Sequence, residues 1–141
     1  MRQTPTTQRI LAQSIPTTNV PNQIEWSYLY ETDEDSPIPP FTTLEHEVIT
    51  VESGYRLLLK GVMCSATSKH TDIGSDAMLK AWIVITTPGF LGDRFFRTTD
   101  ALTFEPSQEV KAGHTLYLYL HNISSEKIHA TVNFIGVKEM V

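Results

Sequence analysis

The chain has 141 residues, a length typical of one domain that can fold without a disulfide or a structural metal. Its formal net charge of −5 argues against non-specific binding to nucleic acid, because that binding needs a positive field. A single cysteine, no signal peptide and no apolar run near the roughly 20 residues of a membrane span predict a protein made in a cytoplasm, without disulfides or a membrane partner.

The first 23 residues differ in composition from the rest of the chain. They are rich in Thr, Gln, Pro and Asn, and their prolines oppose both helix and central strand. This segment has no acidic residue and two basic ones, Arg2 and Arg9, and its apolar anchors are Ile10, Leu11 and Ile15. We interpret residues 1–23 as an extended arm that lies on its own domain or on a neighbouring subunit. A disordered tail is the alternative.

The domain is predicted to span residues 24–141 and to consist of short strands between polar loops. In the first strand, alternation places Trp26, Tyr28 and Tyr30 along one face. The charged and proline-rich residues 31–40 and the polar residues 65–76 are predicted loops. Further strands are predicted at 44–51, 55–63, 77–87, 94–97, 116–121 and 128–134.

The predicted strand 77–87 is apolar on both faces, which favours a central position in a packed domain. One face carries Ile83 and its apolar neighbours, and the other carries Trp82 and Val84. Because tryptophan buries a large area, we interpret Trp82 and Trp26 as core residues.

The pattern Val-x-x-Gly-x-x-Leu-x-Leu occurs twice, at 51–59 and at 110–118, which places the copies 59 residues apart. Each glycine, Gly54 or Gly113, is predicted to form a turn between two strands. The repeat therefore predicts two similar β halves folded against each other. Its second copy is predicted to open a hairpin from Leu116 to Phe134, apolar on one face and polar on the other.

No segment shows sustained helical periodicity, and roughly eight short strands in two matching halves are typical of a two-sheet β-sandwich. We predict an all-β, jelly-roll-like sandwich with an extended N-terminal arm. An immunoglobulin-like sandwich is the second choice. The chain lacks the paired cysteines of antibody domains, although many such folds lack them too.

The sequence offers few groups for catalysis or cofactor binding. His121 and His129 are predicted to share a face of the last hairpin, with His114 as a third candidate, but a metal site needs three or four convergent ligands. Cys64 lies in an apolar run, and no Gly-x-Ser-x-Gly nucleophile motif exists. Asn122-Ile-Ser124 matches a glycosylation acceptor, which we interpret as a turn. We predict a protein that is not an enzyme and has no cofactor.

Two groups of large side chains are candidate contact residues. Tyr117 and Tyr119 lie along one face of a predicted strand, where such rings would stack on a sugar in a carbohydrate-binding module. Phe90 and Leu91 lie in a glycine-containing turn, with Phe95 and Phe96 close behind it. These side chains would mark an interface if they are exposed, and would close one end of the sandwich if they are not.

Three stretches resemble the last part of many virion β-sandwiches: Phe104-Glu-Pro106, Val110–Leu118 and Asn122-Ile-Ser124. With the arm, they give the chain a resemblance to the capsid cement or decoration proteins of tailed bacteriophages. That resemblance implies a virion protein that binds the outside of a capsid and clamps neighbouring subunits, as a homo-oligomer such as a dimer or trimer. Its partners would be the major capsid protein or other virion subunits. The predicted partner-binding residues are Arg2, Arg9, Ile10, Leu11, Ile15, Phe90, Leu91, Tyr117 and Tyr119.

Two other functions stay open. The first is a carbohydrate- or receptor-binding module, such as a phage fibre or spike domain, which predicts exposed, coplanar aromatic side chains. The second is a cupin-like enzyme, which predicts a stoichiometric metal ion.

Overall fold

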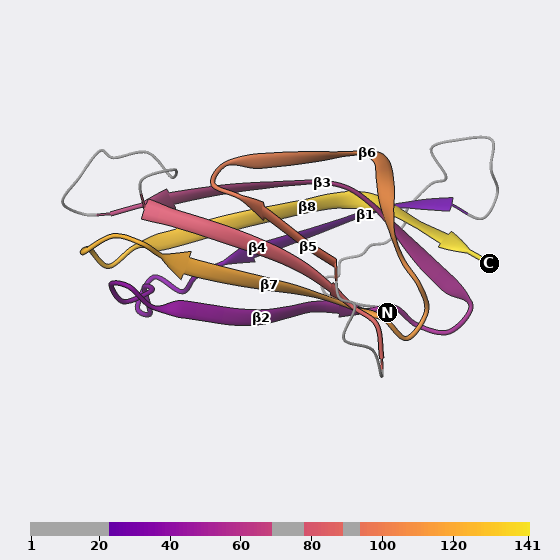
Figure 1. Ribbon diagram of the computed structural model, residues 1–141, viewed down its shortest axis with the longest axis horizontal. Helices are drawn as coiled ribbons and strands as arrows, with labels where there is room; N and C mark the ends of the chain where they lie inside the picture. Colours follow the sequence, from indigo (N-terminus) through magenta and orange to yellow (C-terminus); the bar gives the residue numbers. More distant parts are fainter. Residues whose placement is uncertain (1–22, 69–77, 89–93) are drawn as a thin grey trace.

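The computed structural model describes residues 23–68, 78–88 and 94–141, which are drawn in colour in Figure 1. Seven of the predicted partner-binding residues lie outside the described residues: Arg2, Arg9, Ile10, Leu11, Ile15, Phe90 and Leu91. The arm and the interface at the Phe90 turn therefore stay predictions.

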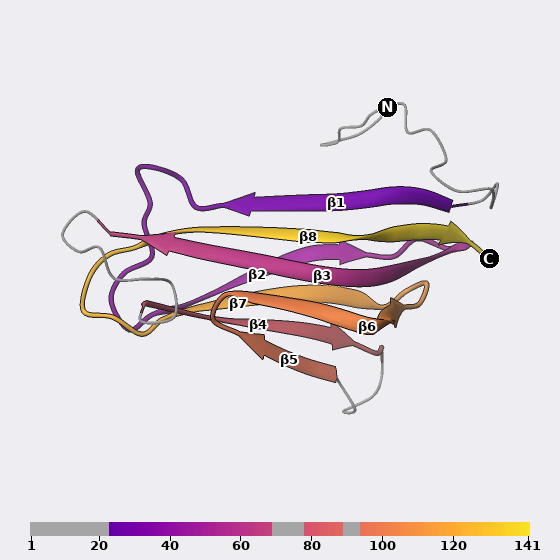
Figure 2. The same cartoon turned by 90° about the horizontal axis from the view of Figure 1, so that it is seen from above.

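The described residues are all-β, as predicted, and their strands run along the long axis of the molecule (Figures 1 and 2). The strands are β1 (Gln23–Glu31), β2 (Thr43–Thr50), β3 (Tyr55–Thr67), β4 (Leu79–Thr86), β5 (Arg94–Thr98), β6 (Ala101–Val110), β7 (Thr115–Asn122) and β8 (His129–Met140). Three strands differ from expectation. β8 continues to Met140, past the predicted end at residue 134, and no strand is predicted at the position of β6. β3 continues to Thr67, where the sequence predicts a loop from residue 65. β6 contains Pro106, which an edge strand tolerates.

The strands form two antiparallel sheets of four strands each, in the orders β1-β8-β3-β6 and β2-β7-β4-β5. We call them the first and second sheets. This arrangement is a jelly roll, so the predicted fold class is confirmed. The strand orders also relate the two halves of the chain. If β1–β4 are renumbered as β5–β8 and β5–β8 as β1–β4, the order of the first sheet becomes that of the second sheet read in reverse. The topology thus agrees with the two halves that the repeat predicts.

The two copies of the repeat form turns that carry the chain from one sheet to the other. Gly54 and Gly113 have φ angles of +88° and +82°, a conformation that residues with a Cβ rarely adopt. These turns contact each other directly. The Gly113 N–H donates to the carbonyl oxygen of Val51, with an N···O distance of 2.8 Å. The Val51 N–H in turn donates to the carbonyl oxygen of His114, at 3.0 Å. The repeat therefore ties the two sheets together at one end.

The predicted hairpin from Leu116 to Phe134 is wrong. β7 pairs with β2 and β4 in the second sheet, whereas β8 pairs with β1 and β3 in the first. The connection between them crosses from one sheet to the other, so their apolar faces meet across the core. Alternation identifies which side chains of a strand are buried, but it does not identify the strand that lies beside it.

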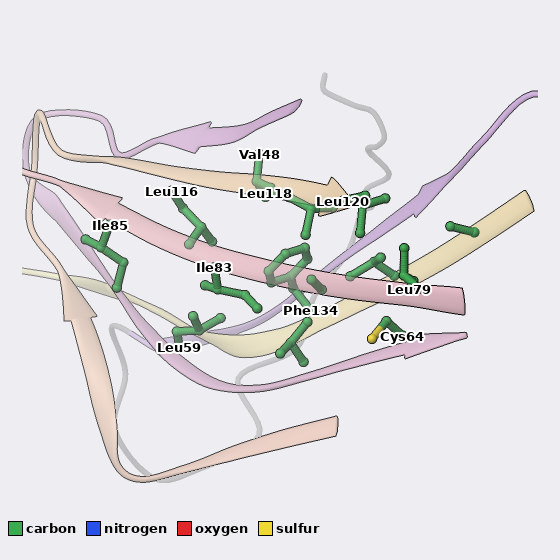
Figure 3. Close-up of a cluster of buried hydrophobic side chains, with 14 of the residues drawn as sticks. Val48, Leu59, Cys64, Leu79, Ile83, Ile85, Leu116, Leu118, Leu120 and Phe134 are labelled. Carbon is green, nitrogen blue, oxygen red and sulfur yellow. The ribbon is translucent and has the colours of Figure 1, made fainter. Parts of the chain in front are cut away.

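The core lies between the sheets and contains side chains from both (Figure 3). Its largest fully buried members are Phe134, Ile38, Leu57, Leu59, Met78, Leu79, Ile83, Ile85, Leu116, Leu118, Leu120 and Ile128. Cys64 is buried among them, as predicted (Figure 3). Burial raises the pKa of its thiol to about 11, so this cysteine behaves as a small apolar side chain.

An aromatic cluster closes the side of the sandwich between the edge strands β1 and β2. Trp26, Tyr28 and Tyr30 lie on one face of β1 and pack, half-buried, against the core, as predicted. The Tyr28 hydroxyl oxygen lies 2.7 Å from Nε2 of His46 on β2, and the Tyr30 and His46 ring centroids are 4.4 Å apart. Burial lowers the pKa of His46, against an opposing effect of Glu47, so folding favours the neutral imidazole.

The side chain of Asn122, at the end of β7, joins two connections. It is fully buried, and its Nδ2 donates to the carbonyl oxygens of Ile38, Pro39 and Glu126 at 3.0, 3.0 and 2.7 Å. Its Oδ1 accepts from the backbone N–H of Ser124 at 2.9 Å and from the Ser124 hydroxyl at 2.7 Å. The predicted turn is confirmed, and the amide that a glycan would need is engaged inside the fold.

Candidate partner-binding face

The outer face of the second sheet carries a group of aromatic side chains. Residues of β7 alternate between buried and half-buried, which turns Tyr117 and Tyr119 outward. Strand pairing places Tyr119 beside Trp82, and it places Tyr117 in one row with Val84 and Phe95. We call Trp82, Phe95, Tyr117 and Tyr119 the aromatic face.

The rings of the aromatic face are partly exposed and are supported by their neighbours. Trp82 is 36% exposed and Phe95 is 58% exposed. The Tyr117 and Tyr119 ring centroids are 6.3 Å apart, with 39° between the ring planes. Val84 points to the same outer face and pairs with Tyr117 on one side and with Phe95 on the other. It is nevertheless buried. The surrounding rings therefore shield it from solvent.

Charged side chains lie on two sides of the aromatic face. On β2, Glu45 pairs with Tyr119 and Glu47 pairs with Tyr117, so this side is acidic. On β5, Arg97 pairs with Trp82, and its guanidinium carbon lies 5.5 Å from the Trp82 ring centroid in a cation–π contact. An apolar centre between charged edges is the usual composition of a protein interface.

The interpretation of Trp82 as a core residue is wrong, whereas Trp26 packs against the core. The inward face of β4 is fully buried, but Trp82 lies on the opposite, outer face. β4 is an inner strand between β7 and β5, as its two apolar faces predict. Its second apolar face contributes to the aromatic face instead of a second layer of core. Phe95, which the sequence marks as an interface residue if exposed, is exposed, whereas Phe96 packs against the core. Sequence reasoning missed Arg97, whose only signal is the alternation within the short stretch 94–97.

The histidines considered as metal ligands do not come together. His121 lies on the second sheet, where its Nδ1 is 2.7 Å from the Thr43 hydroxyl oxygen. His129 begins β8 in the first sheet, and His114 lies in the turn before β7, at the other end of that strand from His121. The prediction that His121 and His129 share a face is wrong, for the same reason as the hairpin.

Two further observations bear on the candidate site. Among the described residues, no three His, Cys, Asp or Glu side chains are placed to hold a metal ion. In the same part of the chain, no helix has the length and apolar character needed to cross a bilayer.

No protein-family model matches the chain, and no curated protein matches its sequence. The function is therefore inferred from the fold and from the chemistry of the exposed faces.

Proposed function

We propose that the chain is a structural virion protein that binds the outside of a capsid and stabilises it by clamping neighbouring capsid subunits. The observation that carries this proposal is the aromatic face, which offers a Trp and two Tyr side chains with Arg97 beside them. Trp, Tyr and Arg are the residues most enriched among those that dominate binding energy in protein interfaces. Jelly rolls also recur in viral shells, as well as in lectins and cupins.

The size of the face favours binding in many copies. Four strands about 4.8 Å apart and eight residues of about 3.3 Å each give the second sheet an outer area of roughly 500 Å². A stable interface buries about 800 Å² on each partner, so one sheet face alone would bind weakly. Many identical copies on a shell offset this weakness. The arm would add a second contact, with Arg2 and Arg9 facing acidic groups on a neighbouring subunit.

A role in binding also agrees with the state of the one thiol. Cys64 is buried and its pKa is raised, so it does not offer the exposed thiolate that nucleophilic catalysis needs. We therefore infer a protein that is not an enzyme and that acts through its surfaces.

Co-sedimentation with purified capsids that lack the protein would test the proposal. The double variant Trp82→Ala with Tyr119→Ala should lose binding, because each aromatic hot-spot residue contributes about 2 kcal/mol or more, or about 30-fold in affinity. Leu29→Ala is the matched control, since Leu29 is an exposed apolar residue on the outer face of the first sheet. Equal binding by the double variant and the wild type would exclude this face as the docking surface.

A carbohydrate ligand is the second candidate, although the 39° between the Tyr117 and Tyr119 ring planes differs from the coplanar arrangement that this function predicts. The half-buried rings of Tyr117 and Tyr119, beside Glu47 and Glu45, offer both a stacking surface and hydrogen-bond acceptors for sugar hydroxyls. Trp82 would report binding directly through its fluorescence. Titration with a panel of oligosaccharides should change that fluorescence if the ligand is a sugar, and should leave it unchanged if the partner is a protein shell.

A further inference from the structure

A hollow of about 450 Å³ lies along β3 and β6 of the first sheet, and no part of the proposed function uses it. Its lining residues come from β3, β6 and β8, and they are mostly apolar: Lys60, Gly61, Val62, Met63, Ala101, Leu102, Thr103, Phe104, Glu105, Pro106, Ser107, Asn133 and Ile135. We call it the β3–β6 hollow.

The hollow forms where β6 leaves β3. Leu59 pairs with Gln108, but the next pair is Gly61 with Thr103, so the register passes over residues 104–107 of β6. Figure 1 shows the sharp bend of the β6 ribbon. Gly61 keeps the floor open, because a Cβ at this position would lie 3.1 Å from the carbonyl oxygen of Leu102.

The hollow combines the features that bind an extended peptide. Met63 and Ile135 at its rim are 60% and 49% exposed, so they offer apolar contact. Residues 104–107 have no ladder partner in β3 and belong to an edge strand, which leaves main-chain groups for a peptide to pair with.

We propose that the segment Ile10–Ile15 of the same chain occupies the β3–β6 hollow, with Ile10, Leu11 and Ile15 as its apolar anchors. This segment lies outside the described residues and has the only adjacent pair of large aliphatic side chains before Gln23.

The described chain begins within reach of the hollow. Gln23 starts β1 in the same sheet, and Ser27, four residues later, stands in one row with Ile135 and Gly61. With strands about 4.8 Å apart and about 3.3 Å per residue, the hollow lies about 18 Å from Gln23. Ile15 precedes Gln23 by eight residues, which span about 26 Å when extended. The segment can therefore cross the first sheet diagonally without strain.

Charge also favours this occupant. Residues 1–22 carry Arg2 and Arg9 and no acidic residue, a charge of +2. The rest of the chain then carries −7, since the total is −5. If residues 10–15 are anchored in the hollow, residues 1–9 remain free to extend about 30 Å from it. This length exceeds the spacing of about 10 Å between the two sheets, so residues 1–9 would reach beyond the edge of the sandwich. The arm could then meet a neighbouring subunit.

A spin label on the arm of the intact protein tests this placement in solution, without any capsid. The label is attached through Gln13→Cys, and the buried Cys64 is spared. We expect strong paramagnetic broadening of the Gly61, Met63 and Thr103 amide signals. Broadening that is absent there, or that is uniform over the domain, would overturn the proposal. Because no particle is involved, a chain that fails this test can still bind capsids through the aromatic face.

Two variants and one mixture sharpen the test. Met63→Lys together with Ile135→Lys should abolish the broadening, whereas Leu29→Lys, a matched exposed position outside the hollow on the same outer face, should leave it unchanged. Broadening that survives the double variant would contradict the proposed anchor site. In a mixture of spin-labelled chain and ¹⁵N-labelled chain without the spin label, broadening of the ¹⁵N signals would show occupation by a second copy and would refute same-chain seating.

Discussion

Replacing Asn122 by alanine should destabilise the fold by about 4 kcal/mol. An amide nitrogen has two hydrogens, so its three contacts, with the carbonyl oxygens of Ile38, Pro39 and Glu126, count as two full hydrogen bonds. The two bonds accepted from Ser124 make four, at about 1 kcal/mol each. This loss is a large part of the roughly 5–15 kcal/mol that stabilises a typical domain.

The remaining contacts limit the loss. The Ile38 oxygen keeps its bond from the Ile128 N–H. The Ser124 hydroxyl has a single hydrogen, shared between Asn122 Oδ1 and the Glu126 oxygen, and in the variant this hydrogen passes wholly to the Glu126 oxygen. The Pro39 oxygen loses the partner that Asn122 provides. The variant should therefore fold, with a lower urea midpoint and an unchanged m-value. Ser65→Ala, at an exposed position of β3 outside the β3–β6 hollow, is the control and should cost little. A loss below about 1 kcal/mol for the Asn122 variant would refute the idea that its side chain joins the two connections.

Three further predictions concern other parts of the fold. Burial lowers the pKa of His46 below its usual 6.5, so the unfolded chain binds the proton more readily. The His46 contribution to stability should be constant above about pH 6.5 and fall as the pH drops toward the folded-state pKa. A pH series of urea melts should lose this component in His46→Gln. Gly136→Ala should cost about 1–3 kcal/mol in such melts, because the new Cβ would lie 2.5 Å from the Leu58 carbonyl oxygen. Gly54→Ala should cost about 1–2 kcal/mol through its φ of +88° alone, since nothing lies within 4 Å of the added atom. Equal stability of either glycine variant and the wild type would contradict its prediction.

The positions of most strands can be read from the sequence, whereas their partners cannot, and β6, which contains Pro106, is not predicted. Alternation in 116–121 and 128–134 locates β7 and β8, because one face of each strand meets the core. The same alternation fits a hairpin and a crossing between sheets equally well, so it does not distinguish the predicted hairpin from the observed crossing. The repeat at Gly54 and Gly113 was the more informative signal, because positive φ at both glycines marks two equivalent turns.

The candidate site was only partly predictable for a related reason. Tyr117 and Tyr119 follow from alternation along one strand. Trp82, Phe95 and Arg97 join them through pairing across three strands, which depends on register and not on local sequence. The β3–β6 hollow depends on a register break between strands far apart in the chain, and no local pattern indicates it.

The temperature at which capsids disrupt is the measurement that decides whether the protein clamps a shell. Capsids assembled from the cognate shell protein would be heated without the chain, with saturating wild type, and with Trp82→Ala combined with Tyr119→Ala. We predict that the wild type raises the disruption temperature and that the double variant at the same concentration does not. A wild-type protein that binds but leaves the disruption temperature unchanged would contradict the proposed stabilising role.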